Sequence, residues 1–208
     1  MVQTLVAGVA WPDKQQVKSP CQPDRWHSYC RERISEHWDK KLKQEAETKQ
    51  SLIFLDISSL SLTKPAKIWS MAGLEATEIK KACIVNWMTL GVYRTRENLH
   101  KMKKAKSNMC TACPLNAIGS LEHYLLYCEF VKEIREKFLP QFILSNPKIT
   151  NLLGNEVALV ISILDPESSL LPENIRYNWE SSKKIYSLSR DYVYNVHRKF
   201  DKFYEKTS

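Results

Sequence analysis

Three cysteines and one histidine fall within the short stretch CTACPLNAIGSLEHYLLYC, which runs from Cys110 to Cys128. The spacing is Cys110-x2-Cys113-x9-His123-x4-Cys128. Three thiolates and one imidazole form a complete tetrahedral ligand set for Zn2+, with no position left for water or substrate. The pattern therefore predicts a structural zinc site at these four residues and argues against a hydrolytic one.

The elements that carry these ligands must meet two different demands. A CxxC pair sits in a tight turn around one ion, which Cys110 and Cys113 satisfy by their spacing alone. On an unbroken α-helix, residues five apart point about 140° apart and are separated by about 7.5 Å along the axis. His123 and Cys128 can therefore reach one ion only if the helix that Ser120 caps ends or unwinds near Tyr127.

Other interpretations of the cysteines stay open. The three could be buried free thiols beside an ordinary histidine, and a redox CxxC would require a βαβ unit, which the sequence does not predict. A second group near the N-terminus has no CxxC pair, and its Cys30 shares an apolar helical stripe with Trp26 and Ile34. We therefore expect core packing for Cys30 rather than metal binding. The second group is Cys21, His27, Cys30 and His37.

A basic segment directly precedes the cysteines. Between residues 94 and 106 six cations face one acid, Glu97, and the whole chain has 31 Lys and Arg against 23 Asp and Glu. A folded zinc site would hold this segment in place for contacts with phosphates. Tyr124 and Tyr127 could stack an unpaired base. The alternatives are a solvated helix face for the lysines and packing over the metal site for the tyrosines. The six cations are Arg94, Arg96, Lys101, Lys103, Lys104 and Lys106.

The fold class predicted is mostly α, a helical domain with a small CCHC zinc-binding insertion, because glycine is scarce and apolar residues recur with helical spacing. Residues 51–65 are predicted as a loop or short strand. A helix is expected over 75–90, with Ile79 and Trp87 inward and Gly91 as the stop. Two further helices are expected to end before Pro140 and before Pro166. The remaining helices are expected from Asp24 to about residue 50, from Thr95 to near residue 106, and over about 181–206.

The predicted organisation is an irregular segment 1–23, a helical region 24–90, a basic helix with the CCHC motif over 91–140, and C-terminal helices over 141–208. No apolar run approaches the roughly 20 residues of a membrane-spanning helix. The first residues lack the basic leader of a secretory signal. The six cysteines are not evenly distributed along the chain, as they would be in the disulfide framework of a small secreted domain. We expect a reduced intracellular protein of the nucleus or cytoplasm.

The motif and its flanks resemble the C-terminal zinc-binding segment of reverse transcriptases from non-LTR retrotransposons. The segments that carry the resemblance are GVYRT (91–95), LHKMKKAK (99–106), Cys110 with Cys113, LEHYLLYC (121–128) and EFVKEIREKFL (129–139). Weaker likeness extends over RWHSYCRERISEHWDKKLKQEAETKQSL, SLTKPAKIWSMAG and YVYNVHRKF, so that it covers roughly residues 24 to 204.

The resemblance implies a zinc-stabilised segment that binds RNA or DNA through the backbone, with no membrane and no small-molecule substrate. It also implies a polyprotein tail without polymerase or endonuclease, because the chain has no Asp-Asp pair for two cations and its seven aspartates are scattered. We therefore expect no enzyme activity, although such a chain could be classed as a polymerase by similarity. The alternative is a protein-interaction module in which the apolar helix Glu156–Leu164 docks a partner.

Overall fold

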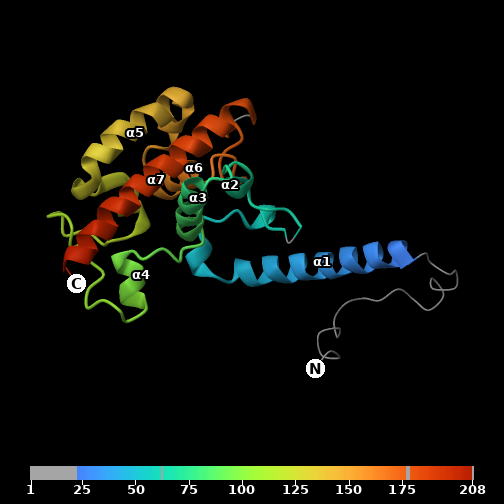
Figure 1. Ribbon diagram of the computed structural model, residues 1–208. Helices are drawn as coiled ribbons and strands as arrows, with labels where there is room; N and C mark the ends of the chain where they lie inside the picture. The colour runs from blue at the N-terminus through green and yellow to red at the C-terminus, as the bar shows by residue number, and fades with distance from the viewer. Residues whose placement is uncertain (1–22, 62, 177–178, 208) are drawn as a thin grey trace. The chain divides into compact units, whose positions relative to one another are not determined.

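The computed structural model describes residues 23–61, 63–176 and 179–207. Over these residues the chain forms helices joined by turns, with no strand and one isolated bridge between Met109 and Ile118, so the prediction of a mostly α fold is confirmed (Figure 1). Among them, no helix combines the length and the apolar character needed to cross a membrane. The α-helices are α1 (Pro23–Glu47), α2 (Lys67–Ser70), α3 (Ala76–Thr89), α4 (Arg96–Lys101), α5 (Lys132–Ser145), α6 (Glu156–Leu164) and α7 (Trp179–Thr207). The short turns are η2 (Gln50–Leu52), η3 (Ile57–Ser59), η4 (His123–Tyr127), η5 (Glu129–Val131) and η6 (Pro147–Leu152).

The chain divides into two units, and the first contains α1 together with residues 60–65. The Ser61 hydroxyl donates to the Asp39 carboxylate over 3.3 Å, which ties the later segment to the helix. The second unit contains residues 50–59 and everything from Ala66 onward. The predicted region 24–90 is thus divided between the two units, and the predicted sections 91–140 and 141–208 lie in one. Apart from Pro23, which begins α1, the predicted segment 1–23 lies outside the described residues.

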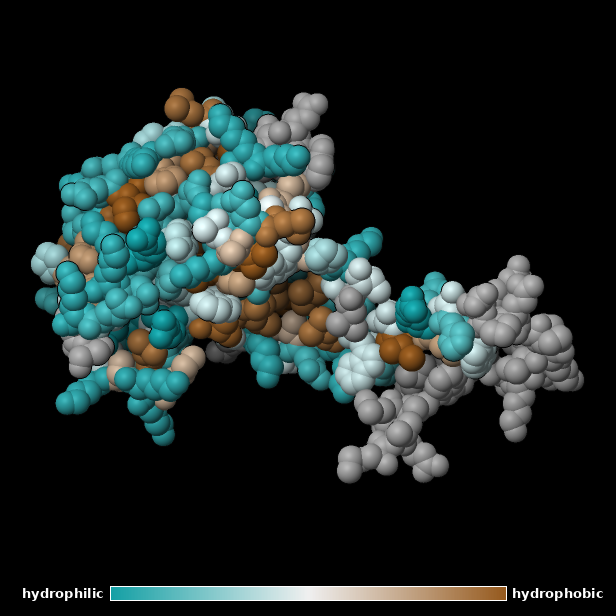
Figure 2. Space-filling view, viewed as in Figure 1, coloured by the Kyte–Doolittle hydropathy of each residue, from teal (hydrophilic) through white to brown (hydrophobic). Residues whose placement is uncertain are grey.

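The core of the second unit forms where α7 packs along α3 and α5 (Figure 1). Ile185, Val193 and Val196 of α7 have no solvent exposure, so one side of this helix belongs to the core. Two ion pairs also join α3 to α7: Arg190 donates to Glu78 over 3.0 Å, and Lys81 meets Asp191 at 2.7 Å. The face shown in Figure 2 is largely hydrophilic over α5 and α7, because their apolar side chains point inward.

Helix α6 is a core helix. Asn155 caps its first turn by accepting from the Ala158 N–H over 3.0 Å, and every residue from Ala158 to Leu164 is buried. The proposed docking of a partner on Glu156–Leu164 is therefore wrong for residues 158–164, because the second unit itself covers them, whereas Val157 is 37% exposed. An apolar helix of nine residues fits a domain interior as well as it fits an interface, and the sequence did not distinguish the two.

Two local predictions need correction, and the choice between loop and short strand for residues 51–65 is decided as a loop. Helix α5 continues through Pro140 rather than stopping there, and the Gln141 side chain donates to the Lys137 carbonyl oxygen within it. On α3 the predicted inward residues Ile79 and Trp87 are 42% and 47% exposed. The segment 51–65 contains two 3-10 turns, η2 and η3, and no strand in its described part.

A turn at Gly91 leads from α3 towards the cysteine motif. Gly91 follows the last turn of α3 with a φ of 66°, in the left-handed region that favours glycine. A Cβ at this position would lie 2.1 Å from the Ser51 carbonyl oxygen. Gly91 therefore ends α3 as predicted and also lets two backbone segments approach closely.

Candidate metal centre

The four predicted ligands converge. One ligand atom from each of Cys110, Cys113, His123 and Cys128 lies within 4.8 Å of the others. The Cys110 and Cys128 sulfurs are 3.9 Å apart, and the Cys113 sulfur lies 3.4 Å from His123 Nε2. A tetrahedral ion with metal–sulfur bonds of about 2.3 Å and metal–nitrogen bonds of about 2.0 Å requires separations of about 3.8 and 3.5 Å. The cluster could therefore hold one metal ion.

A hydrogen-bonded loop presents the first two cysteines. The Cys110 N–H donates to the Ala117 carbonyl over 2.8 Å, and the Gly119 N–H donates to the Asn108 carbonyl over 2.8 Å. These bonds close the loop at its base, and Asn116 takes the left-handed conformation that asparagine tolerates. The loop thus turns both thiols to one side without a regular strand.

A π turn presents the other two ligands. The Ser120 hydroxyl accepts from the His123 N–H over 3.3 Å, and the Cys128 N–H donates to the His123 carbonyl over 2.8 Å. A hydrogen bond from a residue to the one five positions earlier is the mark of a π turn, and it places Cys128 above His123. Cys128 itself leaves the helix with a ψ of 121°. The predicted end of the helix near Tyr127 is therefore confirmed, with the π turn as its means.

Two residues that the sequence did not single out hold this turn. Arg135 Nη1 donates to the Cys128 carbonyl over 3.0 Å, and the Tyr192 hydroxyl donates to the Leu125 carbonyl. The Cys128 carbonyl also accepts from the Val131 N–H over 3.2 Å, so Arg135 adds a second donor where the π turn passes into η5. Arg135 lies in the segment that carries the family resemblance, but no pattern in the sequence links Tyr192 of α7 to residue 125.

Three of the four ligands are buried, and the fourth, Cys113, is half-buried. Cys110 and His123 are each 5% exposed, and Cys128 is fully buried. The hydrogen bond between the Cys110 and Cys128 sulfurs is the main cause that lowers the pKa of Cys110 to about 5 and raises the pKa of Cys128. One thiolate is thus favoured before any ion binds, and binding must displace the remaining thiol protons. A buried, closed set of this kind suits a structural ion.

Tyr124 cannot stack an unpaired base. Its side chain has no solvent exposure, its ring stacks on Phe200 at 3.9 Å between centroids, and its hydroxyl meets the Tyr204 hydroxyl at 2.6 Å. Packing beside the metal site, the alternative considered for both tyrosines, is correct for Tyr124. Tyr127 is 45% exposed and keeps an accessible ring.

The basic helix is shorter than predicted. Helix α4 ends at Lys101, because Lys103 adopts a φ of 58° and the following residues turn back. The N–H groups of Lys104 and Ala105 both donate to the Leu99 carbonyl, over 2.7 and 3.2 Å. The second half of the basic segment is therefore a loop folded against the end of α4.

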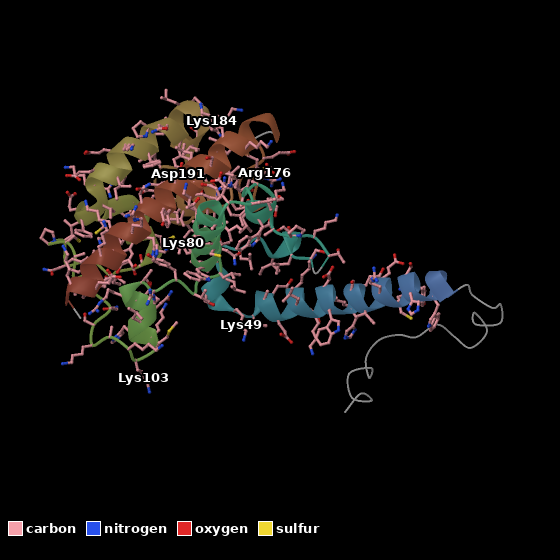
Figure 3. The ribbon with its side chains drawn as sticks, in the orientation of Figure 1. Lys49, Lys80, Lys103, Arg176, Lys184 and Asp191 are labelled. Atoms are coloured by element: carbon pink, nitrogen blue, oxygen red, sulfur yellow. The ribbon has the colours of Figure 1, made fainter. Side chains whose placement is uncertain are left out.

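The six predicted cations differ in availability. Lys103, Lys104 and Lys106 are exposed and form no ion pair with another described residue. Lys101 pairs with Glu97 at 2.8 Å. Figure 3 shows Lys103 pointing away from the body of the second unit.

The two arginines are held by the fold. Arg94 is exposed beside Asp201 at 3.6 Å. Arg96 is half-buried, and its Nε is shielded without a partner in the described structure. The segment therefore offers three free lysines and one lightly paired arginine.

The second cysteine group forms no cluster in the described structure. Cys21 lies outside the described residues, His27 is exposed, and Cys30 and His37 are half-buried on α1. Cys30 is half-buried, and Trp26 and Ile34 on the same stripe are 38% and 45% exposed, so the expected core packing of Cys30 stays a prediction.

Comparisons with known proteins give no match for this chain. No family model matches the chain, and neither the curated proteins nor the solved structures that were searched give a match.

Proposed function

We propose that this chain is a zinc-stabilised nucleic-acid-binding domain, of the kind that its resemblance to the C-terminal part of non-LTR retrotransposon reverse transcriptases implies. The domain contacts the RNA or DNA backbone and has no polymerase chemistry of its own. We place it inside the cell, in the nucleus or cytoplasm, where cysteines stay reduced and available to a metal. The observation that carries the proposal is a run of exposed, unpaired lysines beside a buried Cys3His cluster.

The cluster anchors the lysines through a short connection. Three residues separate Lys106 from Cys110, and Asn108 in that connection is bonded to Gly119 at the base of the cysteine loop. An ion at the cluster restrains this base, so the preceding loop keeps its position. Ammonium groups held in place contact phosphates with a smaller loss of side-chain entropy than those on a free chain.

Zinc is the ion that the donor set favours. Thiolates are soft ligands, and a Cys3His set of four suits the tetrahedral preference of Zn2+. Native mass spectrometry of the purified, reduced protein should find one zinc ion per chain. Cys113→Ser should lose it, whereas Cys83→Ser, which changes a half-buried thiol outside the cluster, should retain it. Metal-free wild-type protein after growth with zinc would contradict the assignment.

Salt titration tests the nucleic-acid contact. Binding to a single strand weakens with salt with a slope of about −0.7 per phosphate neutralised. Replacing Lys103, Lys104 and Lys106 by Ala should therefore reduce the slope by about 2 and weaken binding at low salt. The matched control removes three exposed lysines elsewhere in the second unit, Lys148, Lys183 and Lys184. Figure 3 shows Lys103 and Lys184 at opposite sides of this unit.

The outcome distinguishes the proposal from the protein-interaction alternative. Equal loss in the triple variant and its control indicates attraction by net charge alone and contradicts a contact at the loop. Absence of salt-dependent binding would reject the nucleic-acid function and leave the interaction module. The burial of α6 removes the docking face first considered for that module.

A further inference from the structure

We propose that the outer side of α3 and α7 forms a second contact surface for nucleic acid, one that stacks the bases of a single strand. This surface, called here the α3–α7 face, consists of Lys80, Trp87, Arg94, Tyr194 and Arg198. The inference rests on the proposed function and adds that this face binds the bases of the single strand. None of these residues except Arg94 belongs to the basic segment.

A tyrosine between two cations forms the centre of the face. Lys80 Nζ lies 6.0 Å from the Tyr194 ring centroid, and the Arg198 guanidinium carbon lies 5.9 Å from it. Both distances are within the range of cation–π attraction. Tyr194 is only half-buried, so its ring has an accessible part beside two positive groups. Figure 3 labels Lys80 on α3 and Asp191 on α7, the two helices that carry this face.

An exposed tryptophan extends the face along α3. Trp87 follows Lys80 by seven residues, which returns to the same side of an α-helix about 10.5 Å further along. Its side chain is 47% exposed, more than a core residue of this size requires. The Trp87 carbonyl accepts from the N–H groups of Val92 and Tyr93, over 3.0 and 3.1 Å, so the chain folds back to Trp87 just before Arg94.

A chain of contacts connects the tryptophan end to the tyrosine. The Tyr93 hydroxyl lies 3.1 Å from His197 Nδ1, and the His197 ring lies 6.3 Å from the Tyr194 ring. Arg94 follows Tyr93 and begins the basic segment that leads to Lys103. The α3–α7 face is therefore continuous in sequence with the exposed lysine loop.

The charge of the face is positive. Lys80, Arg94 and Arg198 are exposed, and the acid next to them is Asp201, 3.6 Å from Arg94. The other nearby acids, Glu78 and Asp191, are neutralised by Lys81 and Arg190. Cations around accessible rings are the arrangement by which proteins bind single strands, because phosphates meet the cations while bases stack on the rings. A duplex keeps its bases stacked internally and does not offer them to Trp87 or Tyr194.

Binding of a labelled single strand of about twelve nucleotides tests the inference. Trp87→Ala should weaken the affinity by at least about fivefold, while Trp87→Phe retains most of it. The double variant Lys80→Gln/Arg198→Gln should weaken binding more than Lys183→Gln/Lys184→Gln, which removes the same charge elsewhere on α7. Affinity for a duplex of equal length should change less with Trp87→Ala than affinity for the single strand. Zinc content and thermal unfolding confirm that each variant is folded.

A second measurement uses the wild-type chain and so does not depend on a variant. A single strand that carries 5-bromouracil should crosslink under ultraviolet light to peptides containing Trp87 or Tyr194. If wild-type binding and the lysine-loop effect are present but Trp87→Ala is silent and crosslinks lie elsewhere, this inference is overturned and the proposed function stands. Absence of any binding by the wild-type chain would overturn both.

Discussion

Gly91 shows how one residue ends a helix and permits a close approach at the same time. Gly91→Ala should lower the free energy of unfolding by more than the roughly 1 kcal/mol of left-handed strain, because the new methyl group would also meet the Ser51 carbonyl oxygen. Gly154→Ala is the matched control, since Gly154 has a φ of 98° but open space around its Cβ position. Urea unfolding of both variants measures the difference. Equal losses would show that the close approach to Ser51 carries no cost.

His197 gives the second unit a pH dependence of its own. Burial is the main cause that lowers its pKa below the ordinary 6.5, and Asp201 only partly opposes this. As the pH falls, His197 is therefore protonated in the unfolded chain at a higher pH than in the folded chain. The stability that neutral His197 contributes above about pH 6.5 is lost as the pH falls from there through the lower pKa of the folded state.

His197→Gln tests this, because glutamine can still accept a hydrogen bond from Tyr93 but does not titrate. As the pH falls from 7 towards 5, the melting temperature of the wild type should decrease more than that of the variant. A difference that is constant over this range would contradict the assignment. The comparison of two chains cancels the contribution of the metal ligands, which both retain.

At the scale of elements, α4 depends on its cap because six residues are too few for a stable isolated helix. The buried Thr95 hydroxyl accepts from the Asn98 N–H over 3.1 Å. Thr95→Val keeps the shape but leaves that N–H unpaired, and should cost about 1 kcal/mol of unfolding free energy. Thr95→Ser should cost less, because the hydroxyl is retained. Chemical denaturation of the two variants measures this, and a Val variant as stable as the Ser variant would show that the cap is dispensable.

The elements also show where sequence patterns were sufficient. Thr95 and Ser120, both predicted as caps, each accept a helix N–H, because caps of this kind are local and short stretches of sequence contain them. The inward face of α3 was misplaced because Trp87 and Ile79 are apolar but lie 47% and 42% exposed. Hydrophobicity predicts that a helix has a buried side, but only its neighbours decide the rotation of that side.

At the scale of the whole molecule, the Cys3His cluster is joined to the core by Tyr124 and Leu125, which are fully buried against it. A structural zinc ion binds with free energy that becomes part of folding. Removing metal with a strong chelator should therefore lower the melting temperature of the second unit by more than about 5 °C, and added zinc should restore it. Circular dichroism melting measures both steps. Cys113→Ser should be insensitive to the chelator, and an unchanged melting temperature in wild-type protein would show that no ion stabilises the fold.

The sequence by itself determined the ligand set, the mostly α class, and the need for a helix to end near Tyr127, because these follow from residue type, spacing and helix geometry. Only the tertiary structure decided which surfaces remain free. Tyr124 is buried under α7, and α6 lies inside the core. Trp87 is left exposed, and α4 ends at Lys101. Exposure depends on segments far apart in the chain that compete to cover the same apolar area, and no local pattern records which of them succeeds.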